Sequence, residues 1–326
     1  MSPKQKRILL VAIAIIVIGT MVGLWVRYIN KPTTPPTTIK IGYLNIVAGL
    51  PLLVAQEEGI FKRRGLNVEL VEFKTGNEVA TAAVTGQIDV IGGAATNAVL
   101  DASAESKKGL KIFLINNYIR RDDPNKSSDF LLGQPGIRSV QELRGQKVAI
   151  YPGSVGRIFA ELVFPKYGLQ PQDLQLVELP AAQQQAALAS KQVQAVTALE
   201  PFATSIIEAV HPSILISGYY SEVMKRVPAS GSWFVDGRLP HETERELVEA
   251  FQEAVSLIQQ DRSKVNQILV GKMAVNPDQA GKVRLLEWTM SGDAGAREEL
   301  IQYFDILRSR NVTRFEGTPD VWIWRP

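Results

Sequence analysis

Polar side chains and glycines recur in this sequence at points where a predicted strand gives way to a predicted helix. A helix N-terminus carries unpaired backbone N–H groups and a partial positive charge, so such turns suit the binding of an anionic group. In open parallel sheets these turns lie together, beyond the carboxyl ends of the strands. We therefore expect one ligand site built from Asn45, Gly76, Asn77, Thr96, Asn97, Ser154, Gly156, Arg157 and Glu200.

Most of these residues also have a purely structural interpretation. Ser154 and Asn77 suit the N-caps of their helices, and the glycines can serve only to relax a turn. Arg157 can bind an anion or pair with Glu161, one helical turn further on. Glu200 lies near a helix start, where a carboxylate is favoured without any ligand, but it can also receive an amine or a hydroxyl group.

The sequence lacks the residues on which most enzyme sites depend. It has no cysteine, which excludes disulfides, thiolate metal sites, a cysteine nucleophile and a lipid anchor on an N-terminal cysteine. Its two histidines, His211 and His241, lie beside prolines without an obvious serine or carboxylate partner. No Walker loop, G-x-S-x-G or H-E-x-x-H motif occurs. We expect a binding protein that is not an enzyme and needs no cofactor and no metal.

The distribution of charge is uneven along the chain of 326 residues, which has 36 basic and 33 acidic side chains. Five basic side chains and no acidic one lie in residues 1–38: Lys4, Lys6, Arg7, Arg27 and Lys31. The remaining 288 residues therefore carry 31 basic and 33 acidic groups. A body this close to neutral lacks the basic surface of a nucleic-acid binder, so no nucleic-acid partner is expected.

The N-terminal segment has the pattern of a membrane anchor. Residues 8–26 contain 19 uncharged residues after a basic cluster, and at about 1.5 Å per residue they approach the ~30 Å hydrocarbon core of a bilayer. The positive-inside rule places the basic end in the cytoplasm and the rest of the chain outside. Residues 30–38 (NKPTTPPTT) then form an extended spacer. The alternative is a cleaved signal peptide, which would release the protein to the periplasm.

From Thr38 onward, short apolar runs alternate with helical patterns, and glycines punctuate many of the boundaries. Strands joined by crossover helices form a parallel sheet that is covered on both faces. We predict an α/β fold with strands at 39–43, 68–73, 88–91, 110–115, 147–150, 175–179 and 195–199. Helices are predicted at 50–59, 77–86, 96–104, from 154 onward, 181–190 and 242–260.

A weak internal repeat divides this series in two. Residues 82–90 read AAVTGQIDV and residues 187–195 read ALASKQVQA, so a helix end, a polar turn, a glutamine and a short strand recur in one order. The repeat predicts two Rossmann-like lobes joined by a two-strand hinge. The polar segment 120–128 is the expected first crossing between the lobes, and 227–237 is the expected return.

The predicted organisation has four parts. They are an anchor or signal with its spacer (1–38), the first part of lobe I (39–122), lobe II (123–229), and a return to lobe I with C-terminal helices (230–326). Trp322 and Trp324 are expected to pack a C-terminal strand or tail against the first lobe.

Several ordered motifs resemble the substrate-binding proteins of the nitrate/sulfonate/taurine ABC importer group. In the first lobe they are AQEEGIFKRRGL (55–66), TGNE (75–78) and QIDV (87–90), and in the second SVQELRGQKVAIYPGS (139–154) and LASKQVQAVTALEPFA (188–203). The likeness covers about residues 39–240. Two departures stand out: Gln194 replaces an aspartate of the group, and the lipoprotein cysteine is absent.

The resemblance implies a type II periplasmic-binding architecture and a monomer that receives a small solute between its lobes. The solute would be anionic or zwitterionic, and a sulfonate, a taurine-like amine, nitrate, bicarbonate and a thiamine-precursor pyrimidine all stay open. A separate permease with its own ATPase subunit would complete the importer. The alternatives are a membrane-tethered sensory domain and an enzyme on the same fold.

Overall fold

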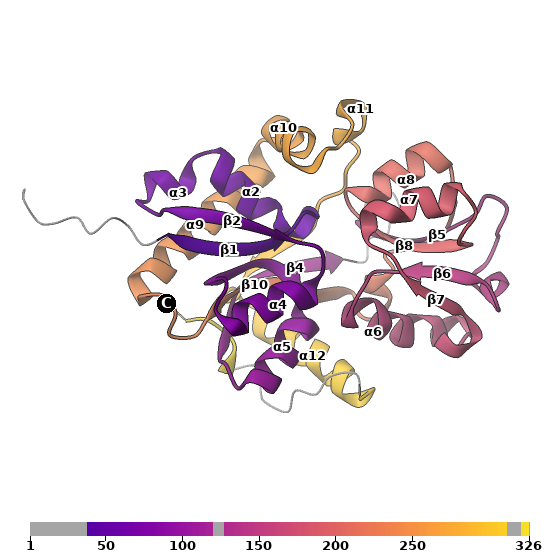
Figure 1. The fold of residues 1–326 in the computed structure, drawn as a ribbon, viewed down its shortest axis with the longest axis horizontal. Coiled ribbons are helices and arrows are strands. Elements are labelled where there is room, and N and C mark those ends of the chain that lie inside the picture. Colours follow the sequence, from indigo (N-terminus) through magenta and orange to yellow (C-terminus); the bar gives the residue numbers. More distant parts are fainter. Residues whose placement is uncertain (1–37, 120–126, 312–320, 326) are drawn as a thin grey trace, which may run out of the picture. The chain divides into compact units, whose positions relative to one another are not determined.

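Two β-sheets organise the described part of the chain, residues 38–119, 127–311 and 321–325, in this computed structural model (Figure 1). The first sheet has six strands in the order β11-β4-β10-β3-β1-β2. Its strands are β1 (Ile39–Leu44), β2 (Val68–Phe73), β3 (Val90–Ala95), β4 (Leu110–Ile119), β10 (Arg226–Val235) and β11 (Glu287–Met290). It forms the first lobe.

The second sheet has five strands in the order β7-β6-β8-β5-β9 and forms the second lobe. Its strands are β5 (Asp129–Gly133), β6 (Lys147–Ile150), β7 (Gln175–Glu178), β8 (Ala195–Leu199) and β9 (Ser213–Ser217). The likeness of the two lobes that the internal repeat predicts is visible in the parallel part of each sheet, where β1 lies between β2 and β3, and β6 between β7 and β8.

The prediction of parallel sheets is correct for only part of each sheet. β1 is parallel to β2 and β3, and β6 to β7 and β8, but each sheet also contains antiparallel strands. β10 lies between β3 and β4 and runs antiparallel to both, and β5 does the same between β8 and β9. β11 is also antiparallel to its neighbour β4. Each of the inserted strands β5 and β10 is the first strand after the chain crosses from one lobe to the other, so the chain reverses direction after each crossing.

Most of the segment 227–237, expected to be the return crossing, instead belongs to the buried strand β10, which ends at Val235. Its proline and its small residues are typical of a loop, since proline cannot donate a ladder hydrogen bond in a central strand. The register shifts between Val227 and Ser230, and this bulge accommodates Pro228. The chain therefore returns earlier, between β9 and β10, through the short helix η6 (Tyr220–Glu222). The limits of the four predicted parts stay predictions.

Helices cover both faces of each sheet (Figure 1). In the first lobe α2 (Leu50–Glu57), α3 (Ile60–Arg63) and α9 (His241–Gln260) pack together on one side, and α4 (Gly76–Thr85), α5 (Thr96–Ser106) and α12 (Ala296–Ser309) lie on the other. In the second lobe α7 (Ala181–Ala189) and α8 (Phe202–Val210) lie on one face of the sheet, and α6 (Ser154–Val163) lies on the other. The remaining helices are α10 (Arg262–Met273), α11 (Pro277–Ala280), η1 (Val47–Gly49), η3 (Val140–Leu143), η4 (Phe164–Tyr167) and η5 (Pro171–Asp173).

The C-terminal segment packs on the first lobe, as the two tryptophans predict. Ile323 forms a parallel bridge to Ile112 of β4, and the N–H group of Trp324 donates to the Ile112 carbonyl at 2.8 Å. Trp322 and Trp324 are both buried. This tail covers a core in which the rings of Phe113 and Phe234 stack 4.3 Å apart.

The predicted membrane anchor, residues 8–26, lies outside the described residues. Within the described ranges, no helix combines the length and the apolar character that a membrane crossing requires.

Candidate functional site

A small cavity lies between the two lobes, at the carboxyl ends of β1, β3 and β6. The first lobe contributes Leu44, Ile46, Ala48, Gly76, Gly93, Ala94, Ala95, Tyr118, Ala229 and Ser230, and the second contributes Tyr151, Val155, Leu199 and Tyr220. The cavity has a volume of about 30 Å³, which is room for about two water molecules. The lobes are therefore closed on each other in this structure.

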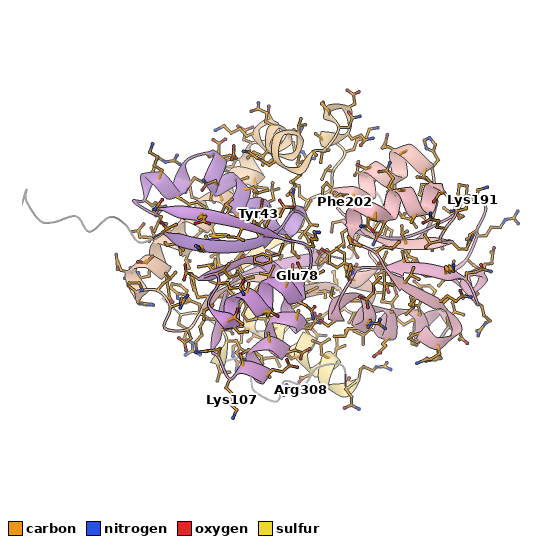
Figure 2. The ribbon with its side chains drawn as sticks, viewed as in Figure 1. Tyr43, Glu78, Lys107, Lys191, Phe202 and Arg308 are labelled. Atoms are coloured by element: carbon orange, nitrogen blue, oxygen red, sulfur yellow. The ribbon has the colours of Figure 1, made fainter. Side chains whose placement is uncertain are left out.

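Neutral side chains line this cavity. None of its described lining residues is charged, and three of them, Tyr118, Tyr151 and Tyr220, are tyrosines. The rings of Tyr118 and Tyr220 meet edge to face at 5.0 Å. Burial raises the pKa of Tyr151 to about 12, and the Glu78 carboxylate at the start of α4 adds to the rise (Figure 2). These phenols stay protonated at neutral pH and offer hydrogen-bond donors without charge.

Three helix N-termini converge on the cavity. Gly76 is the first residue of α4, Ala95 precedes α5, and Val155 lies in the first turn of α6, and all three line the cavity. In the described structure no side chain caps α5 or α6, so their first-turn N–H groups lack the partner that an N-cap supplies. The site therefore presents backbone donors and partial positive charge where side-chain charge is missing.

Three of the predicted site residues meet where the lobes touch. The Asn97 side chain of α5 donates to the Ser154 hydroxyl at 2.9 Å. The Asn77 side-chain oxygen of α4 lies 3.4 Å from both the backbone nitrogen and the hydroxyl of Ser154. These contacts join α4 and α5 of the first lobe to α6 of the second. We call Asn77, Asn97 and Ser154 the interlobe latch.

The interpretation of Asn77 and Ser154 as N-caps is wrong. The cap of α4 is Thr75, whose hydroxyl accepts a hydrogen bond from the Glu78 N–H at 3.2 Å. Ser154 is the first residue of α6, after Gly153 in the capping position. Gly153 has a φ of +86°, and a Cβ there would lie 2.5 Å from the Asn77 side-chain oxygen. Glycine at this position therefore lets the latch form.

The four remaining uncharged candidates, Gly76, Gly156, Thr96 and Asn45, lie in different places. Gly76 lines the cavity. Gly156 packs α6 against the end of β6, because a Cβ there would lie 1.9 Å from the Tyr151 carbonyl oxygen. Thr96 is buried and donates to the Pro228 carbonyl at 2.8 Å, and the Asn45 side chain donates to the Lys272 carbonyl at 3.2 Å. A ligand contact by any of the nine candidates stays a prediction.

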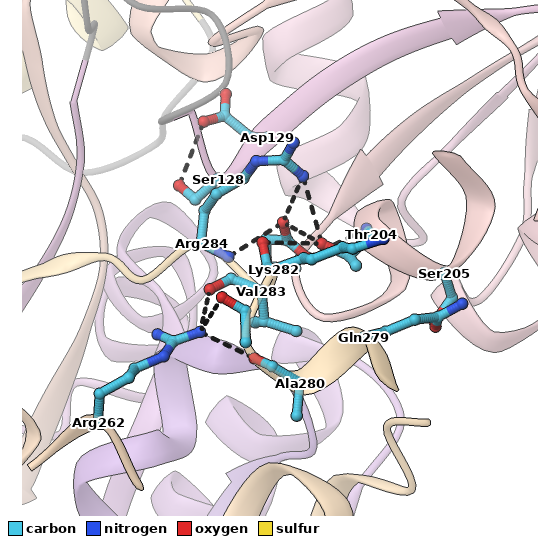
Figure 3. A network of polar contacts seen from close by, with 12 residues as sticks. Ser128, Asp129, Thr204, Ser205, Arg262, Gln279, Ala280, Lys282, Val283 and Arg284 are labelled. Atoms are coloured by element: carbon cyan, nitrogen blue, oxygen red, sulfur yellow. Dashed lines mark hydrogen bonds and ion pairs between the residues drawn. The ribbon is translucent and has the colours of Figure 1, made fainter. Parts of the chain in front are cut away.

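The two charged candidates are engaged with other side chains of the protein. Arg157 is exposed, and its Nε lies 2.6 Å from Glu178, not paired with the expected Glu161. Glu200 is buried, and its carboxylate accepts hydrogen bonds from Thr204 and from Arg284 (Figure 3). Burial raises the pKa of Glu200, while Thr204 and the Arg284 guanidinium oppose the rise. Neither residue is among the described lining of the cavity.

Sequence reasoning missed the tyrosines and Ser230. Tyr151 follows β6 directly, and the rule that places ligands at strand ends could have found it. Tyr118 lies in β4 beyond the predicted end of that strand, and Tyr220 lies in the second crossing, which comes earlier in the chain than predicted. Ser230 belongs to β10, a strand whose residues have the pattern of a loop.

Residues 32–269 match the sequence model of the NMT1-like family, which is more than half of the chain. The chain belongs to the NMT1-like family. A Brucella abortus protein named as a binding protein is 27% identical over 174 residues, which are 53% of this chain and 51% of that protein. A 4-amino-5-hydroxymethyl-2-methylpyrimidine phosphate synthase of Saccharomyces cerevisiae is 25% identical over 124 residues, which are 38% of this chain and 34% of the enzyme. The chain thus spans about half the length, or less, of the curated relatives it matches.

Solved structures of binding proteins share the fold of this NMT1-like protein. The alkanesulfonate-binding protein SsuA from Xanthomonas axonopodis pv. citri, bound to MOPS, superposes with a TM-score of 0.71 at 19% identity and covers 90% of this chain and 100% of that one. The periplasmic nitrate-binding protein NrtA from Synechocystis PCC 6803 gives a TM-score of 0.62 at 14% identity, with 88% and 87% covered. The predicted resemblance is confirmed, and the two mixed sheets form the fold of periplasmic binding proteins.

Proposed function

We propose that this protein is an extracytoplasmic solute receptor of an ABC importer. The observation that carries the proposal is the cavity between the lobes, to which both lobes contribute and on which three helix N-termini converge. A solute bound there contacts both lobes at once and so stabilises the closed arrangement over an open one. The closed form then delivers the solute to a permease, whose separate ATPase subunit drives import.

The chemistry of the cavity supports a small anionic or zwitterionic organic solute. Its anionic group would accept hydrogen bonds from the first-turn N–H groups of α5 and α6. Its uncharged part would pack against Tyr118, Tyr151 and Tyr220. Sulfonates, taurine-like amines and nitrate fit the first requirement, and a solute with an organic body also fits the second. The cavity must open to admit any of these, since its volume is about 30 Å³.

Residues 8–26 would tether the receptor to the plasma membrane, with the two lobes on the extracytoplasmic face. The same tether would also suit a sensory domain, which is the alternative function. Permease and ATPase genes next to the gene of this protein would favour import, whereas a kinase gene next to it would favour sensing. We propose binding without turnover, because the described cavity lining offers no cysteine, histidine or carboxylate to act as nucleophile or base.

The first experiment is a thermal-shift panel on the full chain in detergent, with taurine, alkanesulfonates, nitrate, bicarbonate and a pyrimidine as solutes. A solute that binds only the folded protein, at 100 times its dissociation constant, adds about 2.7 kcal/mol of stability. We expect a small anion or zwitterion to raise the unfolding midpoint. Native mass spectrometry of the untreated protein would detect a solute that co-purifies. The proposal fails if no solute shifts the midpoint, or if a solute is recovered chemically altered.

Ser154→Ala is expected to weaken solute binding about fivefold, because it removes the hydroxyl that accepts from Asn97 in the interlobe latch. The measurement is the solute concentration that gives half of the maximal midpoint shift. Ser256→Ala is the matched control, since its exposed hydroxyl on α9 bonds only within that helix, to the Gln252 carbonyl. Equal affinities of the two variants would show that the latch does not contribute to closure around the solute.

A further inference from the structure

A segment of the C-terminal region extends from the first lobe onto the second. We call residues 274–286, between α10 and β11, the strap. Both flanking elements belong to the first lobe, because α10 packs against α2 and β11 pairs with β4. Between them the strap contacts α8 of the second lobe: Gln279 accepts from Ser205 at 3.3 Å, and Lys282 pairs with Glu208 at 2.6 Å. The two lobes are therefore connected by the two chain crossings and, in addition, by the non-covalent contacts of the strap.

One arginine holds the strap on the side of the first lobe. The Nη2 group of Arg262, at the start of α10, donates to the carbonyl oxygens of Ala280 at 2.8 Å, Gly281 at 3.2 Å and Val283 at 2.7 Å (Figure 3). Three acceptors around one cationic nitrogen fix the path of the strap backbone immediately before Arg284.

A buried ion pair holds the strap on the side of the second lobe. Arg284 donates to the Glu200 carboxylate through Nη1 and through its backbone N–H, each at 3.2 Å. Thr204 donates to the same carboxylate through its hydroxyl at 2.8 Å and its N–H at 3.1 Å. The guanidinium also lies over the Phe130 ring, 5.2 Å from its centroid. Only 1% of the Glu200 side chain is exposed, so its charge depends on these partners.

The backbone of Glu200 connects this ion pair to the hinge and to the cavity. Its N–H donates to the Ser128 carbonyl at 3.0 Å, next to the first crossing, and its carbonyl accepts from the Val47 N–H of the first lobe at 3.2 Å. The residues that follow Val47 and precede Glu200, Ala48 and Leu199, both line the cavity. One residue therefore touches the strap, the hinge and the cavity wall.

We propose that the Glu200–Arg284 pair is a positioning element that holds the two lobes closed, and so brings the cavity walls of both lobes together. Neither side chain is among the described lining of the cavity, so the pair acts through the strap and the backbone of Glu200. The functional consequence of closure rests on the proposed receptor function, but the distance between the lobes does not. Because this distance is measured without solute, a failure of this proposal is distinguishable from a failure of the receptor function.

The test is a pulsed-EPR distance between spin labels on the two lobes of the full chain. Because the sequence has no cysteine, Thr81→Cys on α4 and Ala186→Cys on α7, both exposed, place one label on each lobe. We expect the wild type to show mainly the short distance. Arg284→Gln should raise the ratio of long to short distances about tenfold or more, because a hydrogen-bonded charge is lost. Lys282→Ala, which removes an exposed ion pair of the same strap, should leave the ratio within about twofold.

Glu200→Gln is the second variant, for the case that Arg284→Gln does not fold. It keeps the volume of the side chain and an acceptor for Thr204 but loses the charge, so the ratio should change in the same direction by a smaller factor. A wild type that is already open, or variants that lose thermal stability with unchanged distances, would overturn the proposal. A change as large in Lys282→Ala as in Arg284→Gln would also overturn it, because the strap would then act without the buried pair.

Discussion

Gly156→Ala is expected to destabilise the protein by about 3 kcal/mol or more and to abolish solute binding. A Cβ at this position would lie 1.9 Å from the carbonyl oxygen of Tyr151, 2.9 Å from its carbonyl carbon and 3.1 Å from its nitrogen. These atoms belong to the backbone, so the clash cannot be relieved by rotating a side chain. Either α6 moves away from β6 or Tyr151 moves, and Tyr151 lines the cavity.

The measurement is the free energy of unfolding in urea, with Gly271→Ala as the matched control. Gly271 lies at an exposed position of α10, and a Cβ there would meet no atom within 4 Å. The same substitution is expected to stabilise the protein by about 0.5–1 kcal/mol at that position, because alanine favours a helix over glycine. Gains in stability of similar size in the two variants would show that helix propensity, and not the contact with Tyr151, decides the outcome.

The parts of the fold that depend on local pattern could be predicted from the sequence. β2, β6 and β8 begin and end at the predicted residues. The long helix α9 also begins within one residue of its predicted start. β10 could not be predicted in this way. Its proline and small residues are those of a loop, and only pairing with β3 and β4, more than a hundred residues upstream, makes it a strand.

Among the site residues, too, some positions could be predicted from local sequence and others could not. The strand-end rule places Gly76, Asn77, Asn97 and Ser154 in turns that follow β2, β3 and β6. In the structure Gly76 lines the cavity, and Asn77 and Asn97 contact Ser154 across the two lobes. The partner of Glu200 could not be predicted, since Arg284 lies 84 residues downstream in a region where the family motifs give no guidance. A charged residue at a strand end can face a ligand or a distant segment of its own chain, and local sequence does not distinguish the two.

Asp129 is expected to make the stability of the protein fall as the pH rises from about 4 to about 7. It begins β5, and its buried carboxylate accepts hydrogen bonds from the N–H groups of Tyr220, at 2.5 Å, and Ser221 in the second crossing. Burial raises its pKa from 3.8 to about 7, because these N–H groups and the Ser128 hydroxyl do not offset the lost hydration. The tyrosines Tyr118 and Tyr220 lie near it and add no positive charge.

The direction of this pH dependence follows from whether the folded or the unfolded chain holds the proton on Asp129. Below the unfolded pKa of 3.8, both the folded and the unfolded chain are protonated at Asp129. Between that value and about 7, only the folded chain keeps the proton, so unfolding releases it and the free energy of unfolding falls as the pH rises. The loss is complete near pH 7 and is on the order of 4 kcal/mol for the full shift.

Urea unfolding of Asp129→Asn and of the wild type, from about pH 5 to about pH 8, measures this contribution. The amide does not titrate but can still accept from the Tyr220 N–H, so we expect a flatter pH profile for the variant. Asp305→Asn, with a 64% exposed side chain on α12, should keep the wild-type slope. Parallel profiles of wild type and Asp129→Asn would mean that the carboxylate is ionised throughout this range. In that case the two N–H groups of the second crossing would stabilise the buried charge more than burial opposes it, and the hinge would be held by a permanent anion.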